Sequence, residues 1–240
     1  MSNWITHCRI ADALLLTGLD VDAEHFSVGN IAPDCNVENE DWSAFIPPRE
    51  VTHWMYDEKN KLSADYEGFY AQHLANRPEI SKEERSFLLG YYVHLITDVE
   101  AQRDMRDPER VKNIFARIAA KPELAIKVCG LPANMDTLKS VFGGRNAVSQ
   151  DIRYLENDYL LSHPDSVYNT FVRRVTAFPD YLAYLPAGAV PRKVRVMAKS
   201  ADPNMESPDF LFYSKEEYEA LIQNTTECIL TALRKKGIAV

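Results

Sequence analysis

One stretch of the chain, Phe87–Asp104 with the sequence FLLGYYVHLITDVEAQRD, constrains the fold more than any other. Up to Ile96 it is apolar nearly all round a helix, which predicts a central helix surrounded by others. His94 and Asp98 lie inside it, four residues apart, so a helix places both side chains on one face. Burying them is costly unless they pair or bind a metal ion. The stretch therefore predicts a helical core built around a polar pair.

Helical periodicity recurs along the chain, and no strand-like alternation stands out. Expected helices occupy roughly residues 4–16, 22–28, 63–76, 108–120, 122–128, 136–142, 146–161 and 165–185, the last one bent or broken near Pro179. Capping boxes at Ser81 and Ser214 predict the starts of the central helix and of a C-terminal helix at 214–236. Prolines predict a long loop at 186–209. At 240 residues, the chain is expected to form a single all-α domain, a multi-helix bundle spanning 1–240.

The net charge of −8 argues against a broad nucleic-acid footprint and against attraction to anionic membranes, whereas a small phosphate-bearing substrate fits. No run approaches the ~18 uncharged apolar residues of a transmembrane segment. His7, Arg9 and Asp12 interrupt the apolar N-terminus, so we expect no signal peptide and a cytoplasmic location. Scattered cysteines indicate small buried hydrophobes in a reducing compartment. They are Cys8, Cys35, Cys129 and Cys228.

Three further side chains join His94 and Asp98 as candidate ligands. His7 lies on the apolar stripe of the first expected helix, where a core histidine bonded to the backbone is the ordinary interpretation. Asp34 ends a turn, where a carboxylate usually caps a helix or faces water. His53 lies on an irregular stretch or at a helix start, where histidines are usually exposed. Together the five side chains form a nitrogen and oxygen set that suits zinc, manganese or iron.

Four motifs carry these residues: THCRIADALL with His7, FSVGNIAPD with Asp34, VTHW with His53, and FLLGYYVHLITD with His94 and Asp98. In residues, order and approximate spacing they resemble the zinc-dependent phospholipase C family and, more distantly, the single-strand-specific zinc nucleases that share its all-helical fold. The resemblance covers roughly residues 4–104. It implies a bundle of the phospholipase C type in which Asp34, His53, His94 and Asp98 surround one metal ion. Asp98 would bridge toward a second ion shared by His7, and Asp34 is alternatively the general base.

Two departures from the family concern the remaining metal ligands. Secreted relatives use a processed N-terminal tryptophan, whereas here Trp4 follows three other residues, so we expect that ligand to be missing. Relatives also place a histidine six residues past the aspartate, where this chain has Asp104, and no HxxxE or HxxxD follows. Asp104 with Asp151 or Asp158 would form an all-oxygen site suited to manganese or magnesium. A solvated acidic helix face is the ordinary alternative for Asp151 and Asp158.

The leading functional hypothesis is a metal-dependent hydrolase that attacks a phosphoester with a metal-activated water, with Asp34 and Asp98 as catalytic carboxylates. Phospholipid-type, nucleotide and small phosphodiester substrates all fit, although an acidic protein without a basic amphipathic helix suits anionic membranes poorly. Candidate phosphate-binding residues are Arg103, Arg106 and Arg145, for which a surface arginine is the ordinary alternative. A basic cluster in the expected loop either attracts an anionic substrate or is only solvated. It comprises Arg192, Lys193, Arg195 and Lys199.

Two other interpretations of the five polar residues stay open. In the first, the protein binds a metal ion without hydrolytic activity, and the ion staples the core helices together or serves a sensing role. In the second, the histidines and aspartates only form hydrogen bonds to one another in a metal-free core.

Overall fold

The computed structural model describes residues 3–57, 60, 62–142 and 149–240. Helix makes up 59% of the structure and strand 3%, which confirms the all-α class. The α-helices are α1 (Trp4–Leu15), α2 (Ala23–Gly29), α3 (Arg49–Thr52), α4 (Tyr66–His73), α5 (Lys82–Met105), α6 (Pro108–Ala119), α7 (Pro122–Val128), α8 (Met135–Val141), α10 (Gln150–Ser162), α11 (Val167–Thr170), α12 (Ala189–Met197) and α13 (Lys215–Lys235). Two 3-10 helices, η1 (Ala32–Asp34) and η2 (Val172–Arg174), and a hairpin of β1 (Val37–Glu38) and β2 (Phe45–Ile46) complete the described elements.

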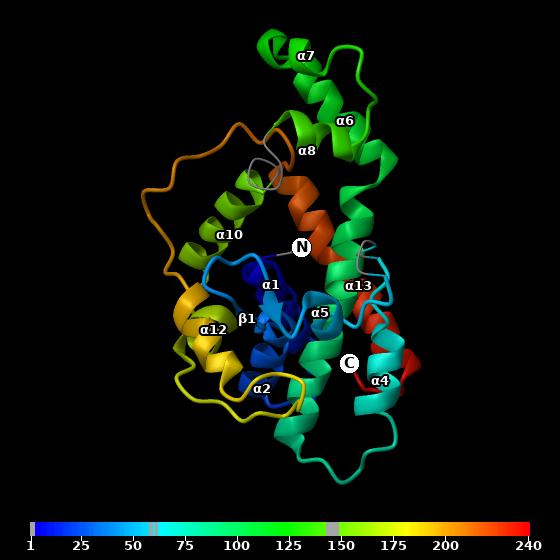
Figure 1. Ribbon diagram of the computed structural model, residues 1–240, viewed down its shortest axis with the longest axis vertical. Helices are drawn as coiled ribbons and strands as arrows, with labels where there is room; N and C mark the ends of the chain where they lie inside the picture. Colours follow the sequence, from blue (N-terminus) through cyan, green and yellow to red (C-terminus); the bar gives the residue numbers. More distant parts are fainter. Residues whose placement is uncertain (1–2, 58–59, 61, 143–148) are drawn as a thin grey trace.

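Helix α5 is the central element that the apolar stretch predicts. It has 24 residues and runs lengthwise through the molecule, with α1, α2, α4 and α13 around its lower part (Figure 1). Every residue from Ser86 to Val99 is buried, including His94 and Asp98. Its N-terminus is capped by Ser81, whose Oγ accepts the Glu84 amide at 3.1 Å. The sequence therefore predicted both the position and the burial of this helix correctly.

Two glycines bring α2 into backbone contact with α5. A Cβ added at Gly29 of α2 would overlap with the main-chain oxygen of Phe87, and one added at Gly90 of α5 would overlap with the main-chain oxygen of Phe26. Any other residue at either position would push the helices apart, because the overlap is with backbone. This close crossing places the end of α2, at Asn30, directly against the face of α5 that carries His94.

The C-terminal helix begins where the sequence predicts. Ser214 and Glu217 form a complete capping box at the start of α13, in which each side chain accepts the other residue's amide. Helix α13 packs against α5 and α1. Gly237 follows the helix with φ +72°, a conformation that favours glycine. This helix closes the bundle on the side of α5 opposite the hairpin segment (Figure 1).

The predicted long loop at 186–209 is wrong in its first half, which forms α12. Pro191 lies in the first helical turn, where a missing amide removes no intrahelical bond. Val190 and Val194 are buried on one face, and Lys193 is buried as well because its Nζ pairs with Glu38 of β1 at 2.7 Å. One member of the basic cluster, Lys193, is therefore part of the packed fold. The proline-rich composition of the segment did not indicate this helix or its ion pair with Glu38.

Two other local expectations are wrong. The helix expected at 165–185 is reduced to α11 and η2, followed by irregular chain whose Phe178 and Tyr181 pack on Phe87 at ring distances of 5.7 and 5.1 Å. The hairpin, in which Val37 pairs with Ile46, has strands of two residues. Such strands are too short to show an alternation of apolar and polar residues in the sequence. The expected start of the helix at 146–161 lies outside the described residues, and α10 is described from Gln150.

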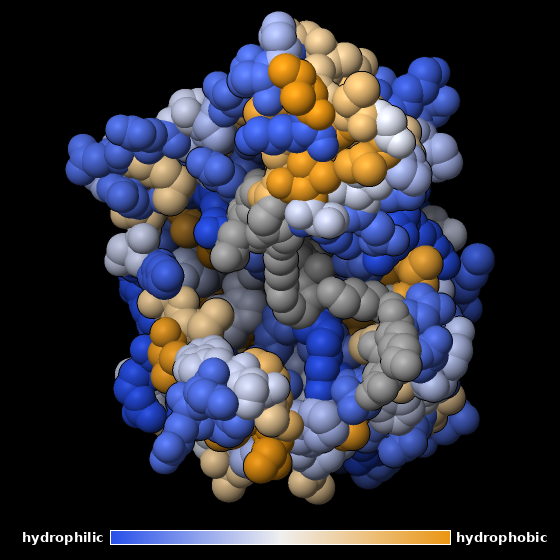
Figure 2. Space-filling model, turned by 45° about the horizontal axis from the view of Figure 1, so that its top comes forward, coloured by the Kyte–Doolittle hydropathy of each residue, from blue (hydrophilic) through white to orange (hydrophobic). Residues whose placement is uncertain are grey.

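The surface in Figure 2 is mostly hydrophilic, with hydrophobic side chains gathered toward the top of the view, where α6–α8 lie. Helix α7 contributes no buried residue, and its Ile126 is 77% exposed. Cys8 and Cys35 are buried as expected, but Cys129 is exposed, contrary to the expectation. Among the described helices, none combines the length and the apolar character needed to cross a membrane.

Candidate metal centre

The five candidate ligands converge on one place in the core. They come from separate elements: His7 from α1, Asp34 from the end of η1, His53 from the C-cap of α3, and His94 and Asp98 from α5. Within the described residues, two sets of three have ligand atoms that lie within 4.8 Å of one another. One set is His7, His94 and Asp98, and the other is Asp34, His53 and His94. His94 belongs to both, so the two sets form one continuous cluster.

Distances between the donor atoms match those of a metal coordination sphere. His53 Nε2 lies 3.3 Å from His94 Nε2, 3.4 Å from Asp34 Oδ1 and 3.7 Å from Asp98 Oδ2. The same Asp98 oxygen lies 4.0 Å from His94 Nε2, and its other oxygen lies 3.6 Å from His7 Nε2. Zinc bonds of ~2.0–2.2 Å in tetrahedral geometry separate neighbouring donors by about 3.3–3.6 Å. The three donors of each set therefore lie close enough together to share one ion.

Two of the imidazoles point their Nε2 atoms toward each other in the cluster. His94 Nδ1 lies 2.9 Å from the main-chain oxygen of Asn30, and His53 Nδ1 lies 3.2 Å from that of Arg49. A carbonyl oxygen only accepts hydrogen bonds, so the contact with Asn30 places the proton of the neutral His94 ring on Nδ1 and leaves a lone pair on Nε2. Burial and the neighbouring His7 lower the pKa of His94 well below its ordinary value, which keeps this ring neutral. The Nε2 atoms of His94 and His53 lie 3.3 Å apart, an arrangement that a cation bound to both would stabilise.

His7 is the least satisfied group in the cluster. It is fully buried, and its ring stacks on His94 with centroids 3.9 Å apart and planes 3° from parallel. Within the described part of the chain, neither ring nitrogen has a hydrogen-bond partner, since the 3.6 Å between His7 Nε2 and Asp98 Oδ1 exceeds hydrogen-bond length. Buried polar groups are normally paired. A metal ion beside Asp98 would satisfy His7, so the residues present fit the group.

Both carboxylates are held in the ionised form that metal binding needs. Burial acts to raise the pKa of Asp34, but His53, His94 and Arg49 outweigh it and hold the pKa well below its usual range. Burial acts in the same direction on Asp98, whose pKa is nevertheless held well below its ordinary value, chiefly by His7 and His94. The pair therefore concentrates negative charge beside three imidazoles, which favours a divalent cation.

Arg49 belongs to the cluster, although no motif in the sequence points to it. Its Nη2 donates to Asp98 Oδ2 at 2.6 Å, and its Nη1 lies 3.4 Å from Asp34 Oδ1. Its main-chain oxygen accepts from His53, so α3 positions a ligand and a cation together. The only signal was its place four residues before His53, which becomes informative once the segment is known to be a short helix.

Two of the three arginines expected to bind phosphate, Arg103 and Arg106, lie outside the cluster. Arg103 is 57% exposed and pairs with Glu100 on the outer face of α5. Arg106 donates to its neighbour Gln102 one turn back, and Arg145 lies outside the described residues. Arg49 is thus the arginine that the structure places against the two carboxylates.

The predicted second, all-oxygen site does not form a metal-binding group among the described residues, since the two sets above contain none of its members. Asp151 is buried but accepts the main-chain amides of Phe212 and Tyr213 at 2.6 and 2.9 Å, which anchors the segment before α13. Asp104 accepts the Tyr213 hydroxyl at 2.9 Å. Asp158 is exposed. Asp104 and Asp151 therefore serve structural contacts, which spacing along a helix does not reveal.

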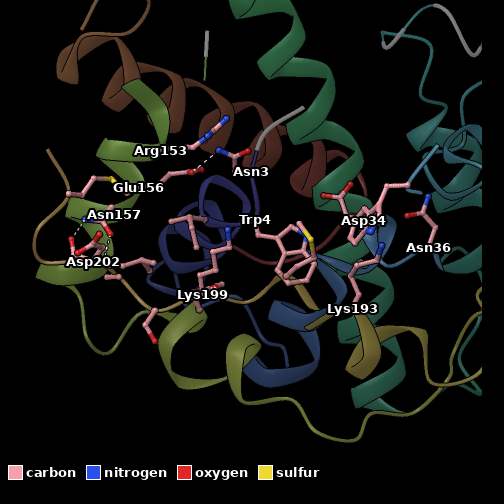
Figure 3. A pocket seen from close by; sticks show the side chains of 18 of the residues that line it. Asn3, Trp4, Asp34, Asn36, Arg153, Glu156, Asn157, Lys193, Lys199 and Asp202 are labelled. Carbon is pink, nitrogen blue, oxygen red and sulfur yellow. Dashed lines mark hydrogen bonds between the residues drawn. The ribbon is translucent and has the colours of Figure 1, made fainter. Parts of the chain in front are cut away.

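A cavity of about 800 Å³ opens beside the cluster, and Asp34 and Arg49 line one end of it (Figure 3). Trp4 lies in its middle, and the far end is formed by Asn157 and Asp202. The lining is largely apolar in area, with four cations and the carboxylates of Asp34, Glu156 and Asp202 added. The apolar side chains include Trp4, Trp42, Phe45, Leu160, Tyr168, Met197 and Met205, and the cations are Arg49, Arg153, Lys193 and Lys199. A cavity of this size accommodates a small organic molecule.

The positions of α1 and α10 around this cavity depend on a buried carboxylate that sequence reasoning missed. Glu156 of α10 accepts the Thr6 amide at 3.0 Å and the Thr6 hydroxyl at 2.8 Å, and it also accepts from Asn3. It thereby satisfies the main-chain amide of Thr6 in the first turn of the helix that carries His7. No sequence signal separates Glu156 from the other acidic residues of α10.

Fold and site together define the class: an all-helical protein with a buried centre of three histidines and two aspartates able to hold a metal ion. Comparisons with protein-family models, with curated proteins and with solved structures found no match to this chain.

Proposed function

We propose that the protein is a metal-dependent phosphoester hydrolase whose helical bundle is of the zinc-dependent phospholipase C type. The observation that carries the proposal is His7, a fully buried imidazole without hydrogen-bond partners in the described chain, aimed at the ionised Asp98. Zinc is the proposed ion, because three imidazoles and two carboxylates are its ordinary ligands and thiolates are absent from the two sets. His53, His94, Asp34 and Asp98 would hold it, with His7 at a position shared through Asp98.

A zinc ion at such a centre supplies a water of lowered pKa and polarises a phosphoryl oxygen. The two carboxylates differ in exposure, and we assign them different roles for that reason. Asp34 is 21% exposed and lines the cavity, so it is placed to accept a hydrogen bond from a water that attacks from that side and to orient it. Asp98 is 9% exposed and contacts both sets of ligands, so it orients them. Arg49 is the cation placed to bind the phosphoryl group.

The cavity supports a substrate with an organic group attached to the phosphate. Its aromatic and aliphatic lining offers apolar contacts beside the cluster, and Lys199 adds positive charge along the same wall. A phosphodiester with an apolar or aromatic substituent therefore fits better than inorganic polyphosphate. Phospholipid, nucleotide and small synthetic diesters share this chemistry.

The proposal predicts that natively purified protein contains a transition metal, at least one equivalent per chain, and hydrolyses bis(4-nitrophenyl) phosphate. Prolonged dialysis against a chelator is expected to remove the ion and abolish hydrolysis, and added zinc is expected to restore both. Elemental analysis and the release of 4-nitrophenolate measure these outcomes. Protein free of metal that hydrolyses the diester at an undiminished rate would contradict the proposal.

A second candidate function is a metal-binding protein without hydrolytic activity. It is favoured by one observation: the cluster joins α1, η1, α3 and α5, so an ion there would staple four segments together. Such binding stabilises the folded state by about 4 kcal/mol when free metal is ~1,000 times the dissociation constant.

Thermal melting separates the two functions. Both predict a lower melting temperature after the ion is removed, because the folded chain binds the ion and the unfolded chain loses the preformed site. Only the hydrolase predicts turnover by the metal-loaded protein across a panel of phosphomonoesters, phosphodiesters and phospholipids. A melting shift without turnover on any member of the panel supports the staple.

A further inference from the structure

We propose that the guanidinium of Arg49 competes with the metal ion for Asp34 and Asp98, so that a phosphoryl group that binds Arg49 strengthens metal binding. The inference rests on the proposed metal centre and adds a coupling between its two ligands, the ion and the anion. Nothing in the residue motifs indicates it, because it depends on where one side chain lies in three dimensions.

Arg49 contacts the same carboxylate oxygens that face the histidines of the cluster. Arg49 donates to Asp98 Oδ2 at 2.6 Å, and this oxygen is the one that also faces His53 Nε2 and His94 Nε2. Its other nitrogen lies 3.4 Å from Asp34 Oδ1, the oxygen that faces His53 Nε2 at 3.4 Å. The arginine and the ion therefore use the same two oxygens, and each oxygen bonded to the guanidinium is a weaker donor to a metal.

The positive charge of Arg49 also acts against a metal ion in the cluster. A guanidinium held against the ligand carboxylates is a positive charge within a few ångströms of a divalent cation, and like charges repel. The Arg49 side chain is 24% exposed, while Asp98 is 9% exposed, so solvent screens this repulsion only in part. Removing the charge of Arg49 is therefore expected to tighten metal binding.

The cavity offers the guanidinium of Arg49 a second position. Arg49 lines the cavity beside Asp34, and its backbone is fixed by α3, where its main-chain oxygen holds His53. The side chain is thus able to turn from the carboxylates toward an anion in the cavity without disturbing that histidine. Arginine binds phosphate through two parallel hydrogen bonds, which offsets the loss of its carboxylate contacts. Since linkage is reciprocal, an anion that draws Arg49 away raises the affinity for the ion.

Zinc affinity of the full-length protein, measured by competition with a chromophoric chelator, tests the proposal. The variants are Arg49→Gln, which keeps a polar side chain without charge, and Arg49→Lys, which keeps the charge without the paired donors. Arg85→Gln, an exposed position of α5, is the matched control for loss of one positive charge. Each protein is measured with and without millimolar inorganic phosphate at nanomolar free zinc.

We expect Arg49→Gln to bind zinc about tenfold tighter than wild type, a coupling of ordinary size. Phosphate is expected to tighten zinc binding by wild type and by Arg85→Gln about fivefold and to leave Arg49→Gln unchanged. Arg49→Lys should fall between wild type and Arg49→Gln in zinc affinity, and it tests the proposal by itself if Arg49→Gln does not fold.

Two outcomes overturn the proposal in different ways. Equal or weaker zinc binding by the Arg49 variants, or a phosphate effect that persists in Arg49→Gln, refutes the competition and leaves the metal centre standing. Absence of zinc binding by wild type and by every variant refutes the metal centre itself, and the competition falls with it.

Discussion

Replacing His94 with alanine is expected to remove the bound metal ion and to abolish phosphodiester hydrolysis. His94 is the residue that belongs to both ligand sets, so its loss leaves neither complete. Changes in residues that merely orient a ligand lower metal affinity by about 10–100-fold, and loss of the shared ligand should exceed about 100-fold. Elemental analysis after desalting and release of 4-nitrophenolate measure the two effects side by side.

The matched control for that experiment is His163→Ala, because His163 is an exposed histidine that stacks on Tyr159, on α10. It is expected to retain wild-type metal content and activity. Circular dichroism of both variants shows whether the helical bundle is intact. A folded His94→Ala protein with undiminished metal content and activity would eliminate the cluster as the site of the proposed chemistry.

Replacing Gly90 with alanine is expected to destabilise the protein, which reverses the usual sign of this substitution in a helix. Helix propensity alone would stabilise the folded state by about 0.5–1 kcal/mol. At Gly90 the added methyl group would meet the main-chain oxygen of Phe26, which cannot rotate away as a side chain could. Overpacking of this kind costs about 1–3 kcal/mol, and we expect a net decrease of about 1 kcal/mol in the free energy of unfolding. Urea denaturation measures it.

The same substitution tests how the fold supports the site. Asn30 follows α2, and its main-chain oxygen fixes the ring of His94 at 2.9 Å. If α2 moves away from α5, this hydrogen bond lengthens and the ring loses its orientation, so Gly90→Ala should also weaken zinc binding. Arg85→Ala, on an exposed face of α5, is the control and should leave both stability and zinc binding nearly unchanged. A Gly90→Ala protein more stable than wild type would contradict the close crossing of the two helices.

What the sequence could predict was the part that local rules govern. Apolar residues on every face of Phe87–Ile96 require a buried helix whatever surrounds it, and Ser81 and Ser214 start helices through hydrogen bonds within one turn. The motifs around His7, Asp34 and His53 then selected the residues that the structure brings together with His94 and Asp98. That these residues bind zinc and hydrolyse a phosphoester is still a prediction.

What the sequence could not predict depends on contacts between distant segments. Lys193 is buried because Glu38 lies opposite it, and Asp151 is occupied because two amides of the segment before α13 reach it. Spacing along a helix places a side chain on a face but does not say what lies across from that face. For this reason the predicted second site at Asp104, Asp151 and Asp158 has no counterpart among the metal-binding groups of the described residues.

The sequence by itself thus determined a helical core with a histidine and an aspartate buried on one face of its central helix, because periodicity and spacing are properties of a single segment. Tertiary structure alone decided that His53 is buried, that His7 stacks on His94, and that Arg49 shares the carboxylates. The physical reason is that α2 and α5 cross closely at Gly29 and Gly90, and that the short helix α3 begins at Arg49 and has His53 as its C-cap. These packings set distances of a few ångströms between residues far apart in the chain.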